Sequence, residues 1–143
     1  MTYTIERYTA ITKELADFLL EVLPKINEMF GNKFDFRNAK YKLMLTKGIF
    51  LVVKRDDEIR GIMIGAKTTH PFDTNVTLLQ QQLFYVKPDS GRAVYHLFKK
   101  FIDIGKTEAD HIITMLTSQT NIKPETLENL GFEKLEILYR MEC

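Results

Sequence analysis

The sequence predicts a single α+β domain that is built on a mixed β-sheet. Its 143 residues are enough for one domain with a buried core and too few for two comfortable ones. Hydrophobic residues make up 45% of the chain and charged residues 27%, which is typical of a globular protein. The segments follow the order β-α-α-β-β-β-α-β-α-β. Antiparallel strands followed by a strand-helix-strand crossover imply a mixed sheet with helices on its faces.

The first predicted elements are a strand and an amphipathic helix. Residues Thr2–Thr9 alternate in polarity and are rich in β-forming side chains, so they predict a strand. Between Ile11 and Leu23, apolar residues recur every three or four positions, which is the pattern of one helix face. Because Pro24 has no amide hydrogen, we expect it to stop or re-direct that helix.

Two further helical pieces and a hairpin complete residues 1–75. Gly31 and Asn32 form a turn signal between the helical pieces, and Gly48 closes the second piece as a C-cap would. A polar connection of hairpin length joins the two strands that follow. The predicted bounds are Lys25–Phe30 and Arg37–Leu45 for the helices, Ile49–Lys54 and Ile59–Lys67 for the strands, and His70–Asn75 for the loop after them.

Residues 76–143 alternate strands with helices. The first strand of this half ends at a loop that contains proline and glycine, and each helix shows an apolar face. The predicted elements are the strand Val76–Val86, the loop Lys87–Gly91, the helix Arg92–Lys106, the strand His111–Thr117, the helix Pro124–Leu130 and the strand Phe132–Met141.

Charge and composition argue against several classes of protein. Twenty basic and 19 acidic side chains give a net charge of +1, so the basic footprint of a dedicated nucleic-acid binder is missing. No apolar run approaches membrane-spanning length, and the single cysteine, Cys143, has no partner for a disulfide or a zinc site. The acidic run Asp56–Glu58 fits a solvated hairpin better than a metal site. We therefore expect a cytoplasmic protein that binds no metal, membrane or nucleic acid.

The loop between the strand Val76–Val86 and the next helix has the composition of an anion-binding turn. The first amides of a helix have no partners inside it, and the helix dipole is positive there. Gly91 lets the backbone approach a ligand, Arg92 adds positive charge, and the small side chain of Ala93 leaves room for the ligand. The same residues would also serve a strand-to-helix turn that binds nothing.

Two separated motifs resemble those of the GNAT superfamily of N-acyltransferases. The segment Val86–Ala93, with its Val-x-Pro step and Gly-x-Ala turn, is similar to the coenzyme A pyrophosphate motif of that superfamily. Asn121 after a strand, followed by a short helix that ends in Asn129–Phe132, is similar to its Asn and Leu-Gly-Phe signature. The order of elements is also similar over nearly the whole chain.

The resemblance implies one GNAT-like domain, residues 1–143, with a central splayed sheet. Residues 1–75 would form the acceptor side and residues 76–143 the acyl-CoA-binding half. The implied reaction is transfer of an acetyl group from acetyl-CoA directly to an amine, and the implied acceptor is a small-molecule or protein amine. The implied cofactor-binding residues are Phe84, Tyr85 and Val86 for the pantetheine arm, Gly91, Arg92 and Ala93 for the pyrophosphate, and Asn121 for pantetheine.

The sequence departs from the family pattern where catalytic groups are expected. Pro88 occupies a position that is usually Gln or Arg, and Leu127 occupies the position of a tyrosine that protonates the leaving thiolate in many members. Three glutamines, Gln80–Gln82, stand where some members carry a glutamate base, and an amide can hold a water but cannot usefully accept a proton. No catalytic residue is assigned. The candidates are Gln80, Gln82 and Tyr139.

Two questions stay open at the level of sequence. The departures also fit a GNAT-shaped binding or structural protein without transfer activity, and the chain is similar to short GNAT-like proteins of bacterial viruses and prophages. The charges of residues 11–46 give no clear preference for the acceptor. A homodimer is also open, because the last strands of this family often pair across dimers.

Overall fold

The computed structural model describes residues 2–116, 122–136 and 139–143. Its five-stranded sheet has the order β1-β2-β3-β4-β5. The first four strands pair antiparallel, and β4 pairs with β5 in parallel, so the predicted mixed sheet is confirmed. The strands are β1 (Tyr3–Arg7), β2 (Ile49–Arg55), β3 (Glu58–His70), β4 (Asp73–Val86) and β5 (His111–Ile113).

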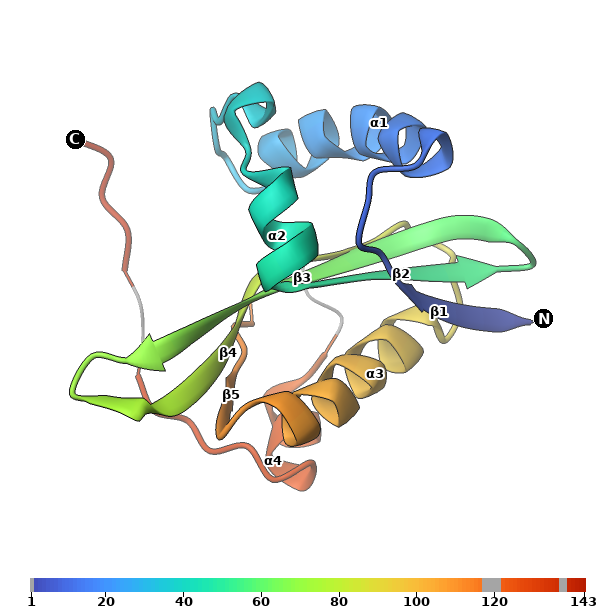
Figure 1. The fold of residues 1–143 in the computed structure, drawn as a ribbon. Coiled ribbons are helices and arrows are strands. Elements are labelled where there is room, and N and C mark those ends of the chain that lie inside the picture. The colour runs from blue at the N-terminus through green and yellow to red at the C-terminus, as the bar shows by residue number, and fades with distance from the viewer. Residues whose placement is uncertain (1, 117–121, 137–138) are drawn as a thin grey trace.

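Helices cover both faces of this sheet (Figure 1). The helices α1 and α2 lie on one face, while α3 and α4 lie on the other. Side chains of β2 alternate between the two cores: Phe50 and Val52 pack on the α1 side, whereas Leu51 and Val53 pack on the α3 side. The helical elements are α1 (Lys13–Met29), the 3₁₀ helix η1 (Phe36–Asn38), α2 (Tyr41–Lys47), α3 (Ala93–Glu108) and α4 (Pro124–Asn129).

The helix α1 runs through Pro24, so the expected stop at this residue was wrong. Pro24 lies on the exposed side of the helix, while Leu23 and Ile26 are buried in the core. Burial of apolar side chains before and after the proline offsets the missing hydrogen bond. The predicted separate helix Lys25–Phe30 is therefore the end of α1.

The second predicted helix, Arg37–Leu45, is divided into η1 and α2. The Asp35 side chain caps η1 by accepting from the Arg37 N–H, and Ala39 is extended, which ends that turn. The side chain of Asn27 bonds both the N–H and the carbonyl of Phe34, so the connection is held against α1.

A long hairpin replaces the predicted loop His70–Asn75. His70 pairs with Asp73, so only Pro71 and Phe72 form the turn. Beyond Gly65, β3 no longer pairs with β2 and pairs with β4 alone. β-branched residues on both strands favour this extension, which the turn-forming composition of the segment concealed.

The predicted last strand, Phe132–Met141, is absent from the parts of it that the structure describes. β5 itself is only three residues long, shorter than the predicted His111–Thr117, and Thr117 lies outside the described residues. So short a strand offers little edge for another strand to pair with. Arg140 instead bonds the side chain of Asn32, beside the end of α1.

Candidate functional site

The strands β4 and β5 part after a short stretch of pairing. Their register covers only three pairs, Leu78–Gln80 with His111–Ile113, whereas β4 continues to Val86. Gln81, which is 6% exposed, closes the paired part, because its side-chain oxygen accepts from the Thr114 hydroxyl and the Met115 N–H. Past Gln81, one edge of β4 is not paired with another strand of the described chain.

A β-bulge lies at the point where the two strands part. On β3, Ile64 faces Leu83 and the next residue, Gly65, faces Gln81, so Gln82 is an extra residue in β4. The extra residue of a bulge has no partner in the ladder. The Gln82 side chain is exposed, in contrast to the buried Gln81 beside it.

The last residues of β4 alternate between the two edges of the strand. Lys87 donates its N–H to the Arg60 carbonyl of β3, at 2.8 Å. Because successive residues of a strand direct their backbone groups to opposite edges, Phe84 and Val86 direct theirs away from β3, toward the opening, whereas Tyr85 faces β3. Two of the three backbone positions predicted for the pantetheine arm thus face the opening.

Side-chain hydrogen bonds from β1, β2 and β3, and from Ser90 within the loop, hold the loop that follows β4. Four consecutive carbonyls, from Lys87 to Ser90, each accept a side-chain hydrogen bond. The bonds are Ser90 Oγ to the Lys87 carbonyl (2.7 Å), Arg60 Nη2 to the Pro88 carbonyl (2.8 Å), Arg55 Nη1 to the Asp89 carbonyl (2.7 Å) and Tyr3 Oη to the Ser90 carbonyl (3.3 Å).

The backbone of this loop has the alternating conformation of an anion-binding nest. Asp89 has a φ of 58° and Gly91 a φ of 59°, while Ser90 between them is not left-handed. Alternation of this kind turns successive N–H groups toward one concavity. Within the described chain, no group accepts a hydrogen bond from the N–H of Asp89, Ser90 or Gly91. These three amides can therefore bind an anion.

The amides of Arg92 and Ala93, two predicted pyrophosphate contacts, have internal partners. Arg92 donates to the Tyr3 hydroxyl at 3.0 Å, and Ala93 donates to the Ser90 carbonyl at 3.2 Å. The Arg92 guanidinium lies over the ring of the exposed Tyr95, 5.0 Å from its centroid. Asn121, the other predicted contact, lies outside the described residues.

The structure does not gather the catalytic candidates into one cluster. Gln80 is half-buried within the paired part of β4, and Gln82 is exposed at the bulge. Tyr139 is 91% exposed, because the strand that was to carry it is not formed in the described residues. Leu127 packs against the core on the α3 side of the sheet.

Sequence reasoning missed the residues that support the loop. Tyr3, Arg55 and Arg60 come from strands that are far from the loop in sequence, and no local pattern connects these residues with it. Ser90 lies in the predicted loop Lys87–Gly91, yet it is only 4% exposed. Its hydroxyl accepts from Arg60 Nε at 2.8 Å and donates to the Lys87 carbonyl.

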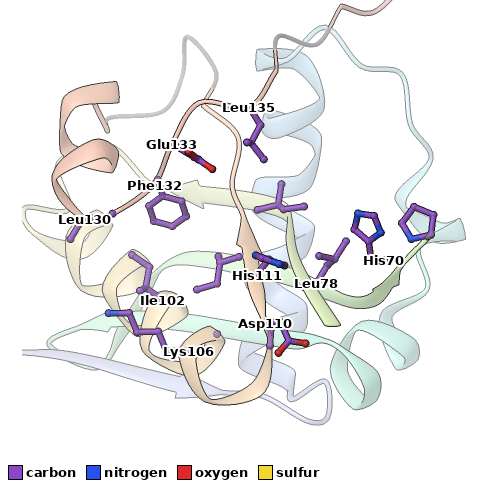
Figure 2. Close-up of a pocket in the computed structure, with 16 residues that line it drawn as sticks. His70, Leu78, Ile102, Lys106, Asp110, His111, Leu130, Phe132, Glu133 and Leu135 are labelled. Carbon is purple, nitrogen blue, oxygen red and sulfur yellow. The ribbon is translucent and has the colours of Figure 1, made fainter. Parts of the chain in front are cut away.

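A pocket that is separate from the loop Lys87–Gly91 lies beside β5 (Figure 2). It has a volume of about 760 Å³, is open to solvent, and is lined by the end of α3, by β5, by the tip of the β3–β4 hairpin and by the segment after α4. His70, Lys106 and His111 are among its polar lining. None of the predicted cofactor-binding residues lines this pocket.

Two ion-pair clusters tie the elements together away from the loop. Arg7 and Lys67 bond Glu108 and hold the pKa of its carboxyl at about 2. Burial alone would lower the pKa of Lys54, but hydrogen bonds to Glu6, Tyr8 and Glu14 raise it above its usual value. In the described part of the chain, no group of three or more His, Cys, Asp or Glu side chains could hold a metal ion, and no helix is long and apolar enough to cross a membrane.

Comparisons with solved structures define the fold. The chain is similar to an aminoglycoside acetyltransferase from an uncultured soil metagenomic sample (TM-score 0.70, 15% identity, 100% of this chain and 99% of that one). It is also similar to ribosomal-protein-alanine N-acetyltransferase from Brucella melitensis biovar Abortus 2308 (0.72, 14%, 100% of both) and to a transcriptional regulator from Bacillus halodurans C-125 (0.74, 13%, 99% and 100%).

These likenesses confirm the GNAT acetyltransferase fold that the sequence predicted. The identities are low, so the likeness concerns the fold and not a particular activity. No family model and no curated protein matches the chain.

Proposed function

We propose that this protein is an N-acetyltransferase that moves the acetyl group of acetyl-CoA to an amine. The observation that carries the proposal is the parting of β4 from β5 beside a bulge, with a nest of free amides at the end of β4. An extended pantetheine arm could follow the free edge of β4, and the diphosphate could meet the amides of the loop. The fold shared with acetyltransferases supports the same conclusion.

The reaction needs a donor for the developing oxyanion. The amine nitrogen attacks the thioester carbonyl carbon, the carbonyl oxygen gains negative charge, and the carbon–sulfur bond then breaks as the amide forms. The thiolate of coenzyme A leaves, and the proton lost by the amine goes to water or to that thiolate. We assign this donor to the N–H of Gln82, the residue of the bulge that has no partner in the β3–β4 register.

Side chains near the opening offer little acid or base chemistry. The amide of Gln82 can hold a water molecule but cannot take the proton, and Leu127 cannot protonate the thiolate. Catalysis would then rest on holding the amine beside the thioester, and the amine would have to arrive neutral. The acceptor would be a small-molecule or protein amine on the side of α1 and α2.

The first test is calorimetric titration with acetyl-CoA, coenzyme A and desulfo-CoA, followed by a thiol-release assay with a panel of amines. Micromolar binding together with amine-dependent thiol release is the expected result. A folded protein that binds none of the three up to millimolar concentration would overturn the proposal. Binding without transfer to any amine would favour the second candidate, a GNAT-fold binding protein, for which Leu127 and the three glutamines argue.

A further inference from the structure

We infer that Arg60, together with Arg55, is a positioning residue for the loop Lys87–Gly91: it aims the loop amides at a diphosphate and does not itself bind the ligand. This inference rests on the proposed function, because the diphosphate is that of coenzyme A. Both arginines flank the β2–β3 turn, and both bond loop carbonyls more than 25 residues away in sequence.

The direction of the loop amides follows from the direction of its carbonyls. In a trans peptide, the C=O of one residue and the N–H of the next point opposite ways, and the described chain has no cis peptide. The carbonyls of Pro88 and Asp89 point at Arg60 and Arg55. The N–H groups of the residues that follow them, Asp89 and Ser90, therefore point away from the arginines, as an anion cradle requires.

Each nitrogen of the Arg60 guanidinium already has a partner. Its Nε bonds Ser90 Oγ at 2.8 Å, its Nη2 bonds the Pro88 carbonyl at 2.8 Å, and its Nη1 pairs with Glu58 at 3.3 Å. The side chain is only 14% exposed. Three of its five N–H groups thus point at protein partners, and little of the side chain is open to a phosphate. Arg60 thus orients the loop through its bonds to Pro88 and Ser90. In the family pattern, the position of Pro88 is usually Gln or Arg, so this loop lacks that side chain.

The test uses inorganic pyrophosphate as the probe and the backbone amide NMR signals of Asp89, Ser90 and Gly91 as the readout. In the wild type, these signals should shift in a saturable way. Arg60→Met and Arg60→Lys should each weaken the response at least tenfold, since an ammonium cannot reproduce the fixed fork that bonds two loop atoms. Arg37→Met removes the same charge from an exposed turn and should leave the response unchanged.

The lysine variant separates positioning from simple charge. If Arg60→Lys restores the wild-type response, the charge of Arg60 matters and its geometry does not, so the inference is overturned. It is also overturned if the wild-type amides ignore pyrophosphate. Thermal unfolding identifies variants that do not fold. Arg55→Met, which removes only the bond to the Asp89 carbonyl, gives the same comparison if Arg60→Met is unfolded.

A parallel titration with coenzyme A distinguishes this inference from the proposed function. If pyrophosphate shifts the wild-type amides but coenzyme A does not bind, the proposed function fails and the positioning role stands. If coenzyme A binds the wild type and both Arg60 variants equally well, the positioning role fails and the proposed function stands.

Discussion

The hydroxyl of Tyr3 accepts a hydrogen bond from the N–H of Arg92 at 3.0 Å, across 89 positions of sequence. The same hydroxyl donates to the Ser90 carbonyl, and the Tyr3 ring lies 4.8 Å from the ring of His96, centroid to centroid. The edge strand β1 is therefore joined to the start of α3 at the loop that we propose for the diphosphate.

Tyr3→Phe should lower the free energy of unfolding by about 1 kcal/mol, because the ring stays while Arg92 N–H loses its acceptor. Urea unfolding measures the change. The matched variant is Tyr95→Phe, whose ring is 45% exposed on α3 and should change stability by less than about 0.5 kcal/mol. Equal effects for the two variants would contradict the role given to the Tyr3 hydroxyl.

Gly91→Ala should weaken coenzyme A binding at least tenfold. A Cβ at this position would lie 2.3 Å from the Tyr3 hydroxyl, so the loop would have to move. Gly31→Ala is the control, because Gly31 has a similar φ of 65° but no atom within 4 Å of the added carbon. Both variants carry backbone strain of about 1 kcal/mol, and only Gly91→Ala disturbs the loop. Calorimetry would show equal affinities if the loop does not hold the cofactor.

Gln81→Leu should lower the free energy of unfolding by about 1–3 kcal/mol, since the part-buried Met115 N–H and Thr114 hydroxyl lose their shared acceptor. Gln82→Leu, one residue away at the exposed bulge, should change stability by less than about 0.5 kcal/mol. Guanidinium unfolding of both variants measures the difference. The reverse order would mean that the register at the bulge is shifted by one residue.

Glu108 should make the free energy of unfolding depend on pH in the acidic range. Hydrogen bonds from Arg7 and then Lys67 lower its pKa from 4.5 to about 2 in the folded protein. Because the folded pKa is the lower one, this stabilisation is complete above about pH 4.5 and is lost as the pH falls toward 2. The side chains are about a third exposed, so we expect a contribution of about 1 kcal/mol.

Urea unfolding at pH 5 and pH 3, for the wild type and for Glu108→Gln, measures this contribution. The loss of stability between the two pH values should be smaller in the variant by about half of this 1 kcal/mol, because pH 3 lies above the folded-state pKa of Glu108 of about 2 and the rest is lost only below it. Identical losses would mean that other carboxylates account for the acid sensitivity.

Pro24→Ala should stabilise the protein by about 1–3 kcal/mol. The substitution restores a helix hydrogen bond in the interior of α1 at an exposed position, and this gain exceeds the entropy that proline removes from the unfolded chain. Differential scanning calorimetry would show a higher melting temperature. A lower one would indicate that the helix is adapted to the proline, for example through a local bend.

The sequence was sufficient to predict most of the fold, because its elements have clear periodicity. The five strands of the sheet and the crossover at α3 follow from alternation and helical spacing. Whether the helix continues past Pro24 could not be predicted, because this depends on how much apolar surface α1 buries on both sides of the proline. The turn at Pro71 was also hidden, since turn-forming residues outweighed the β-branched residues in local propensity.

Only those features of the candidate site that are contiguous in sequence were predicted. The glycine and the strand-to-helix turn are contiguous in sequence, so Gly91 could be singled out. The contributions of Tyr3, Arg55 and Arg60 are long-range contacts, and nothing in their own sequence neighbourhood points to residue 90. Which amides of the loop are free was equally hidden, because it depends on where these three side chains bond the carbonyls.

The strand order β1-β2-β3-β4-β5 is the same as the order along the chain. Each strand leaving the ribosome therefore finds its partner already synthesised, and the sheet can grow by one strand at a time from its N-terminal edge. The bonds of Tyr3 to Arg92 and of Arg7 to Glu108 can form only after residues 92–108 have been synthesised, because they join β1 to α3. A ribosome-bound chain that stops before residue 92 would have most of its sheet but no completed loop for a diphosphate.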